Sequence, residues 1–350
     1  MLEIFAKRFK AARLKSGLSL QALADKIGES ITKQAINKYE HGKAMPDSKK
    51  MIELAKALDV KLDYFFRPSR VEIELSEPAY RKRAAMSKRK LAMIHEFVRD
   101  LIERYVEAET IFNISKPVKL PIEDVRKISS FEDVELLAEN VRELWKLGND
   151  PIESVVDVLE DNNFKVVLID SDKKFDGLSC WGNGEIPIVI SNKNCSGDRQ
   201  RSNIAHELGH LLMNVADGFD EEKAAYSFSA SFLVPREVAI SELGKKRKNL
   251  NWEELLILKQ KYGMSVQQWV YRAKDLGIIS ESHLKSWFIK FNRLGSKREF
   301  GKPIANEIPT RMRKIVFQGL AEELISSPKA AELLNCSINE IKKSMLGISV

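Results

Sequence analysis

The sequence predicts a mainly α-helical protein with one small β-sheet, which is an α+β fold. Apolar residues recur at three- and four-residue spacing through most of the 350 residues, as in helices with one buried face. The pattern changes to short strand-like runs between residues 164 and 191. A hydrophobic content of 44% and a charged content of 31% are ordinary for a globular protein, and the length indicates two or three domains.

The first 67 residues predict a compact domain of short helices. The expected helices cover 2–15, 20–27, 33–41, 49–58 and 62–66. Ser19 and Thr32 are suitable N-caps, and Gly28 and Gly42 are suitable helix stops. Short helices joined by tight turns fit a helix-turn-helix module, in which one helix enters the major groove of DNA.

Residues 68–130 predict a linker followed by a long helix. A basic run from Arg81 to Lys90 leads into an amphipathic helix that ends near Ile111. Such a run is usually a solvated helix face, although it could also contact the DNA backbone. Two more helices are expected at 132–147 and 151–162, the second opened by Pro151.

The remainder predicts three strands and then helices. The strands are expected at 164–170, 177–181 and 186–191. The helices are expected at 198–213, 221–233, 252–262, 265–276, 281–292, 311–326, 329–334 and 338–345. The last two form a second pair of the helix-turn-helix kind. They carry little outward basic or amide chemistry, which favours contact with protein over contact with DNA.

The stretch from His206 to His210, HELGH, carries the clearest chemistry and matches H-E-x-x-H. Residues four apart on a helix share one face, so both imidazoles can bind one metal ion. Zn²⁺ binds imidazole nitrogen at about 2.0–2.1 Å. Glu207 can then serve as general base toward the attacking water. The alternative is two histidines on an amphipathic helix without a metal, but the chain has only 5 His, so a chance match is rare.

A catalytic zinc site needs a third protein ligand. Glu222 is the leading candidate, because it lies in the first turn of the helix expected at 221–233. Glu221 and Asp217 are the alternatives. Acidic residues at this place would also suit a solvated helix N-terminus, so spacing alone leaves the three open.

The stretch from Gly197 to Pro235 resembles the ImmA/IrrE family of zinc metallopeptidases through RSNIAHELGHLLM and EKAAYSFSASFLVP. The resemblance implies a zincin-like domain and a zinc-dependent metallo-endopeptidase activity. It implies the Zn²⁺ ligands His206, His210 and Glu222, with Glu207 as the catalytic base. Mn²⁺ or Fe²⁺ stay open as the metal, because these ligands suit them also.

Two residues depart from the family pattern, Tyr226 in place of Asn and Ser229 in place of Ala. Neither removes a ligand, but Tyr226 changes the hydrogen bonding around the metal ligands. Residues 186–192 resemble an edge strand of the family, so we expect an extended substrate to pair with residues 187–191. Tyr226 and Arg201 are the candidates for stabilising the oxyanion.

The N-terminal domain resembles the Cro/phage-repressor (XRE-like) type of helix-turn-helix. Five outward polar residues are expected to contact DNA: Gln21, Lys33, Gln34, Asn37 and Lys38. The alternative is a solvated polar face. One such domain reads a half-site, so a homodimer is expected. The net charge of +7 also favours a polyanionic partner.

Together these features predict a cytoplasmic regulator that binds double-stranded DNA and cleaves a protein substrate, a repressor or an antitoxin. The expected domains are the helix-turn-helix domain at 1–67, the linker and long helix at 68–130, the metallopeptidase domain at 131–240 and a helical region at 241–350. The sequence has no apolar run of the roughly 18 residues that a membrane span needs, so no membrane partner is expected. Its 3 scattered cysteines do not form a disulfide framework.

Two other functions fit the same sequence. One is a transcription factor with a structural or vestigial metal site. The other is a protease whose N-terminal helices bind a protein substrate instead of DNA.

Overall fold

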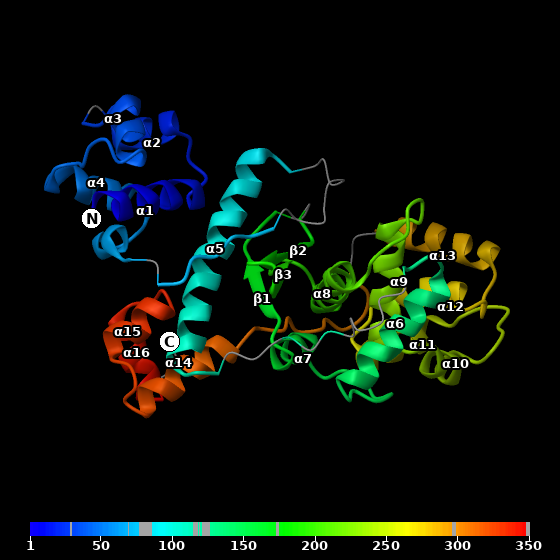
Figure 1. Ribbon diagram of the computed structural model, residues 1–350. Helices are drawn as coiled ribbons and strands as arrows, with labels where there is room; N and C mark the ends of the chain where they lie inside the picture. Colours follow the sequence, from blue (N-terminus) through cyan, green and yellow to red (C-terminus); the bar gives the residue numbers. More distant parts are fainter. Residues whose placement is uncertain are drawn as a thin grey trace. The chain divides into compact units, whose positions relative to one another are not determined.

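The computed structural model describes residues 1–28, 30–68, 70–76, 86–114, 118, 120, 127–172, 175–295 and 299–347. Helices dominate and one three-stranded sheet is present (Figure 1), which confirms the predicted mainly helical α+β fold. The chain forms two compact units. Unit 1 joins Met1–Leu75, Arg81–Ser115 and Met312–Val350, and unit 2 joins Ser76–Tyr80 and Lys116–Arg311. The division into four domains stays a prediction.

The helix-turn-helix domain opens unit 1. Its elements are α1 (Leu2–Lys15), α2 (Leu20–Ile27), α3 (Lys33–Glu40), α4 (Ser48–Leu58) and the 3₁₀ helix η1 (Leu62–Phe66). The side chains of Ser19 and Thr32 accept hydrogen bonds from backbone N–H groups of α2 and α3. Both residues are therefore N-caps, as predicted. Phe9, Ile36 and Phe65 are fully buried in a core to which all five elements contribute.

The rest of unit 1 consists of α5 (Lys88–Ile111) and the C-terminal helices α14 (Arg311–Ala321), α15 (Ser327–Leu333) and α16 (Ile338–Met345). A second core joins them and includes Tyr105, Val316, Leu333 and Ile341. The predicted C-terminal helix pair therefore packs within its own chain. Helix α14 ends before the expected residue 326, because Glu323 takes a left-handed conformation with φ of 57°.

A buried carboxylate connects the helix-turn-helix domain to α5. Asp100 on α5 lies 2.9 Å from the ammonium of Lys15, 3.4 Å from Arg104 and 3.6 Å from Arg67. Burial raises the pKa of Asp100, but these cations outweigh it and hold that pKa below its ordinary value. The ionised carboxylate thus stabilises the attachment of the domain to α5.

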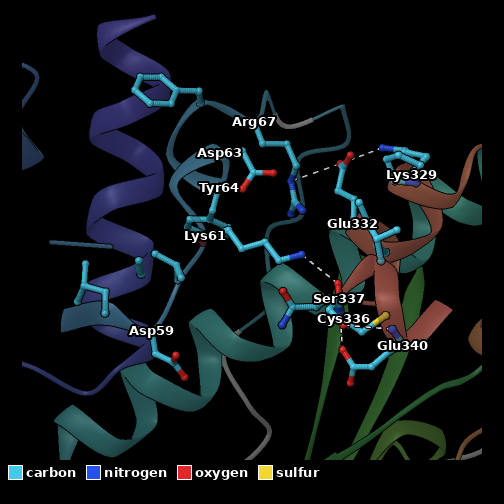
Figure 2. Close-up of a pocket in the computed structure, with 18 of the residues that line it drawn as sticks. Asp59, Lys61, Asp63, Tyr64, Arg67, Lys329, Glu332, Cys336, Ser337 and Glu340 are labelled. Atoms are coloured by element: carbon cyan, nitrogen blue, oxygen red, sulfur yellow. Dashed lines mark hydrogen bonds and ion pairs between the residues drawn. The ribbon is translucent and has the colours of Figure 1, made fainter. Parts of the chain in front are cut away.

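A cavity of about 1300 Å³ lies in unit 1 between the end of the helix-turn-helix domain and the helices α15 and α16 (Figure 2). Lys61 Nζ donates to the carbonyl of Cys336 at 3.0 Å, and Arg67 Nε lies 3.6 Å from a carboxylate oxygen of Glu332. The charged residues of the lining are Lys15, Lys61, Arg67, Lys329, Asp59, Asp63, Glu332 and Glu340. Both signs are equally represented, so charge does not select one class of ligand.

The sheet of unit 2 has the strand order β1-β3-β2, with β1 Lys165–Ile169, β2 Gly177–Gly182 and β3 Ile186–Asn192. Strand β3 is parallel to β1 and antiparallel to β2. The expectation that residues 187–191 form an open edge was therefore wrong. Strand β3 is the central strand. Its continuous apolar run favours this position, because a central strand is buried on both faces.

The helices of unit 2 are α6 (Phe131–Leu144), α7 (Val155–Asp161), α8 (Gly197–Leu212), α9 (Glu221–Leu233), α10 (Arg236–Leu243), α11 (Trp252–Tyr262), α12 (Val266–Asp275) and α13 (Glu281–Leu294). Helices α7 and α8 pack against this sheet, and the other helices of unit 2 extend from α8 through α9 and α12. Helix α7 begins after Ser154, whose side chain caps it, and not at Pro151. The prediction missed α10, which starts directly after Pro235. A proline is tolerated at a helix start, so it does not end all helical structure.

An extended segment, residues 299–310, follows α13; we call it the strap. The side chain of Gln200 on α8 donates to the carbonyl of Glu307 at 3.0 Å and accepts from its N–H at 2.8 Å. Buried Lys259 on α11 donates to the carbonyls of Phe300 and Lys302. A Cβ on Gly197 would overlap the strap carbonyls, so only glycine fits there. The strap therefore binds the first turns of α8.

Candidate metal centre

Two packed helices present the predicted metal ligands. His206 and His210 share one face of α8, as the four-residue spacing predicts, and Glu222 lies in the first turn of α9. A Cβ on Gly209 would lie 3.1 Å from the ring of Phe228 on α9. Glycine at this position thus permits the close approach of α9 to α8, which brings the carboxylate to the imidazoles.

The three ligand groups converge on one point. His206 Nε2 lies 3.1 Å from His210 Nε2, and the carboxylate oxygens of Glu222 lie 3.6 Å and 3.7 Å from these two nitrogens. Around a tetrahedral Zn²⁺ with bonds of about 2.0–2.1 Å, neighbouring ligand atoms are about 3.3–3.4 Å apart. The spacing of these donors therefore fits one tetrahedral metal ion.

The geometry distinguishes Glu222 from the two alternatives. Of the residues that the structure describes, His206, His210 and Glu222 form a group whose ligand atoms all lie within 4.8 Å of one another. Asp217 has a fully exposed side chain and lies 3.7 Å from Lys127 instead. Glu221 lies 3.0 Å from Nδ1 of His210, the nitrogen that faces away from the cluster.

The strand β2 holds Glu207, the predicted catalytic base. Glu207 is only 2% exposed, and the hydroxyl of Ser179 donates to its Oε2 at 2.9 Å. A Cβ on Gly177 would lie 3.1 Å from Cγ of Glu207 and 2.8 Å from the carbonyl of Ile190, so glycine is required there. Sequence reasoning missed Ser179 and Gly177, because small residues in a strand carry no signal of their distant partner.

The same strand is an edge strand of the sheet that the structure describes, and it lies beside Glu207. At one end, Ser76 donates its N–H to the carbonyl of Trp181 at 2.8 Å, and its hydroxyl oxygen accepts from the Trp181 N–H at 2.9 Å. Backbone groups alternate in direction along an antiparallel strand. The N–H and C=O of Ser179 therefore point the same way as those of Trp181, away from β3.

Two other polar side chains near the motif have structural roles. Arg201 is buried and donates to the carbonyls of Ile152 at 2.7 Å and Glu153 at 3.1 Å, and it pairs with Glu307 of the strap. The prediction of Arg201 as an oxyanion donor was therefore wrong. Burial, with a smaller effect of nearby Glu207, raises the pKa of the Cys180 thiol to about 12, so this cysteine stays protonated.

The predicted DNA-binding residues lie at the surface of the helix-turn-helix domain. Lys33, Gln34, Asn37 and Lys38 are exposed on α3, and Gln21 is exposed on α2. A hollow of about 410 Å³ between these helices is lined in part by Gln21, Lys33 and Gln34. These side chains are thus available to a ligand at this face.

The basic run Arg81–Lys90 is described only in part, since residues 81–85 lie outside the described residues. Ser87 caps α5, and Arg89 donates to the carbonyl of Gly17 in the helix-turn-helix domain. This contact uses one cation of the run inside unit 1.

The fold and the site define a class of protein, a helix-turn-helix domain joined to a peptidase domain with an H-E-x-x-H helix. Residues 9–65 match the helix-turn-helix family model, and residues 160–274 match the peptidase family model of the IrrE N-terminal-like domain. The chain therefore belongs to the helix-turn-helix family through its N-terminal domain, and it carries an IrrE N-terminal-like peptidase domain in unit 2.

Two relatives from Bacillus subtilis (strain 168) are similar to part of the chain. The SPbeta prophage-derived uncharacterized HTH-type transcriptional regulator YonR is 38% identical over 74 residues, which are 21% of this chain and 67% of that protein. The uncharacterized HTH-type transcriptional regulator YqaE is 39% identical over 64 residues, 18% of this chain and 53% of that protein. The chain thus spans about half the length of YqaE. No helix among the described residues combines the length and the apolar character that a membrane crossing needs.

Proposed function

We propose that this chain is a DNA-binding transcriptional regulator whose metallo-endopeptidase domain cleaves a regulatory protein, a repressor or an antitoxin. The observation that carries the proposal is the cluster of His206, His210 and Glu222 beside the buried carboxylate of Glu207. The presence of an exposed helix-turn-helix face in the same chain supports a regulatory role in the cytoplasm.

We assign Zn²⁺ to the cluster. Two imidazoles and one carboxylate are a common ligand set for a catalytic zinc ion, and they leave a fourth position open, unlike a structural site with four protein ligands. When bound, Zn²⁺ polarises the scissile carbonyl and lowers the pKa of the attacking water. The carboxylate of Glu221 accepts a hydrogen bond from Nδ1–H of His210. The lone pair of the His210 Nε2 atom is then free to face the metal position.

Glu207 performs the proton transfer in this proposal. Its carboxylate takes a proton from the attacking water and delivers it to the leaving nitrogen of the peptide. The hydrogen bond from Ser179 to Oε2 fixes the orientation of the carboxylate. Burial of Glu207 against β2 limits the water around it, which favours transfer to the substrate.

An extended substrate would pair with β2 and not with β3, since β2 is the edge strand beside Glu207. The outward N–H and C=O of Ser179 supply the backbone hydrogen bonds for such strand addition. A β2 edge positions a peptide by its backbone, so side-chain pockets would supply the sequence preference.

The helix-turn-helix domain would bring the peptidase to DNA as a homodimer on paired half-sites. The amides of Gln34 and Asn37 can make bidentate contacts to adenine, and the ammonium groups of Lys33 and Lys38 can contact guanine or phosphate. Gln21 at the start of α2 would contact phosphate.

The test uses the full chain loaded with Zn²⁺, incubated with the purified repressors and antitoxins encoded beside its gene. Mass spectrometry of the fragments locates any cut. We expect one protein to be cleaved, and we expect Glu207→Gln to abolish cleavage while Asp217→Asn cleaves like wild type. Equal cleavage by Glu207→Gln, or intact proteins under every inducing condition, would overturn the proposal.

A further inference from the structure

The two histidines of the cluster are held in different ways. Nδ1 of His210 has a carboxylate partner, Glu221, at 3.0 Å. Nδ1 of His206 is buried and has no hydrogen-bond partner among the described residues. A metal-ligating histidine almost always donates its second ring N–H to a partner that fixes the ring. His206 therefore needs another source of orientation.

An aromatic ring lies directly against His206. The ring centroids of Tyr226 and His206 are 4.3 Å apart and the rings are tilted by 51°. Tyr226 lies four residues after Glu222 on α9, so both side chains share one helix face. One helix thus presents a metal ligand and the ring that covers another ligand.

Tyr226 is not a residue of the hydrophobic core. Tyr226 is 55% exposed, whereas His206 is only 3% exposed. A half-exposed ring gains little from burial, and its contact with a buried imidazole limits the rotation of that imidazole. The ring of His210 is also in contact with His206, with ring centroids 4.8 Å apart.

We propose that Tyr226 is a positioning residue whose ring holds His206 in the rotamer that directs Nε2 toward the metal position. This inference rests on the metal site of the proposed function and extends it to a residue that binds no metal. The ring, not the hydroxyl, carries the effect, because packing replaces the hydrogen bond that Nδ1 lacks.

The test measures metal affinity and not catalysis. Metal-free full-length protein is titrated with Zn²⁺ against a chromophoric chelator, and the visible spectrum of the Co²⁺ form reports the ligand geometry. We expect Tyr226→Ala and Tyr226→Ser to bind Zn²⁺ about 10-fold or more weakly, with an altered Co²⁺ spectrum. We expect Tyr226→Phe to keep the wild-type affinity and spectrum.

The control is Tyr271→Ala. Tyr271 is also a half-exposed tyrosine, and its ring packs against the ring of Phe288. This variant should leave metal affinity unchanged, and the melting temperature of each metal-free variant reports folding. Wild-type affinity in both ring-free variants, or an equal loss in Tyr226→Phe, would overturn the inference while leaving the metal site intact. A folded wild-type protein that binds no metal would instead overturn the proposed function itself.

Discussion

Replacement of Arg272 by methionine should destabilise unit 2 strongly. Arg272 and Glu135 form a buried ion pair with side chains 2% and 7% exposed. The guanidinium contacts both carboxylate oxygens of Glu135, and it also donates to Ser231 Oγ at 2.9 Å and to the Val234 carbonyl at 3.0 Å. Ser231 and Val234 lie at the end of α9, whose first turn holds Glu222, so this pair anchors the helix that carries the proposed third metal ligand.

The expected cost follows from the uncompensated charge. Removal of one partner of a buried ion pair typically costs about 3–5 kcal/mol, because the other charge stays buried. Ser231 still donates to Glu135 at 3.0 Å, so we expect about 3 kcal/mol at neutral pH. Arg272→Met introduces an unbranched apolar side chain that fills much of the same space, which limits the loss of packing.

The cost should depend on pH in a defined direction. Burial raises the pKa of Glu135, but the hydrogen bond and charge of Arg272 outweigh it and hold that pKa below its ordinary value. A depressed carboxyl pKa stabilises the fold above the unfolded pKa of about 4.3, and this stabilisation is lost as pH falls through the folded pKa. Without Arg272, burial raises the pKa of Glu135, so the variant recovers when Glu135 is protonated. The difference between the two proteins is therefore full at neutral pH and shrinks toward acid.

Urea unfolding between about pH 4 and pH 8 measures this difference. The double variant Glu135→Leu with Arg272→Met should recover most of the lost stability, since an apolar pair carries no desolvation cost. The control Lys274→Met removes an exposed cation of α12 that lies 3.7 Å from Glu281, and it should cost less than about 0.5 kcal/mol. A loss in Arg272→Met that matches this control, or that is constant across pH, would refute the reasoning.

Four further predictions concern the candidate sites. Glu222→Gln should weaken Zn²⁺ binding at least about 10-fold in chelator competition, whereas Asp217→Asn should not; equal behaviour would reject Glu222 as the third ligand. Ser179→Ala should lower kcat for the cleaved protein with unchanged metal affinity, since it frees the catalytic carboxylate to rotate; an unchanged kcat would contradict this. Lys38→Ala should weaken binding to DNA of every sequence. The slope of log K against log salt concentration should fall by about one counterion, and an unchanged slope would place Lys38 away from phosphate. Gly197→Ala should displace the strap and speed its limited proteolysis relative to wild type; equal rates would show that the strap tolerates a Cβ.

The helices were predictable because their boundaries are local signals. Ser19, Thr32 and Asn251 cap helices through contacts within four residues, and the sequence shows each of them directly. Helix α11 was expected at 252–262, which is the range that the structure shows. Helix α7 was misplaced at its start, because Pro151 and Ser154 are both acceptable openings and only packing decides between them.

The strand order was not predictable from spacing. The prediction that residues 187–191 form an edge strand came from the family resemblance. The continuous apolar run of β3 instead favours a central strand. Pairing of β3 with β1 joins Val167 to Ile190 across more than twenty residues, and no local pattern encodes that register. The place where a substrate strand could add therefore had to be read from the topology.

The site divides in the same way. The imidazoles of His206 and His210 were predictable, since one helix turn brings them together. The choice among Asp217, Glu221 and Glu222 required the packing of α9 on α8, which spacing does not contain. The strap was missed altogether, because its hydrogen bonds come from distant side chains, with Gln200 about a hundred residues away and Lys259 about forty.

The two glycines of the site explain how this non-local packing is achieved. Gly209 admits Phe228 and so brings α9 against α8, and Gly177 admits Glu207 and so brings α8 against β2. Each removes one side chain at a contact where a Cβ would push a catalytic element away. A glycine therefore sets the distance from α8 to Glu222, the proposed third ligand, on one side and to β2, the proposed substrate edge, on the other. The H-E-x-x-H motif provides the reactive groups, but the spacing of the elements around it depends on residues that have no chemistry of their own.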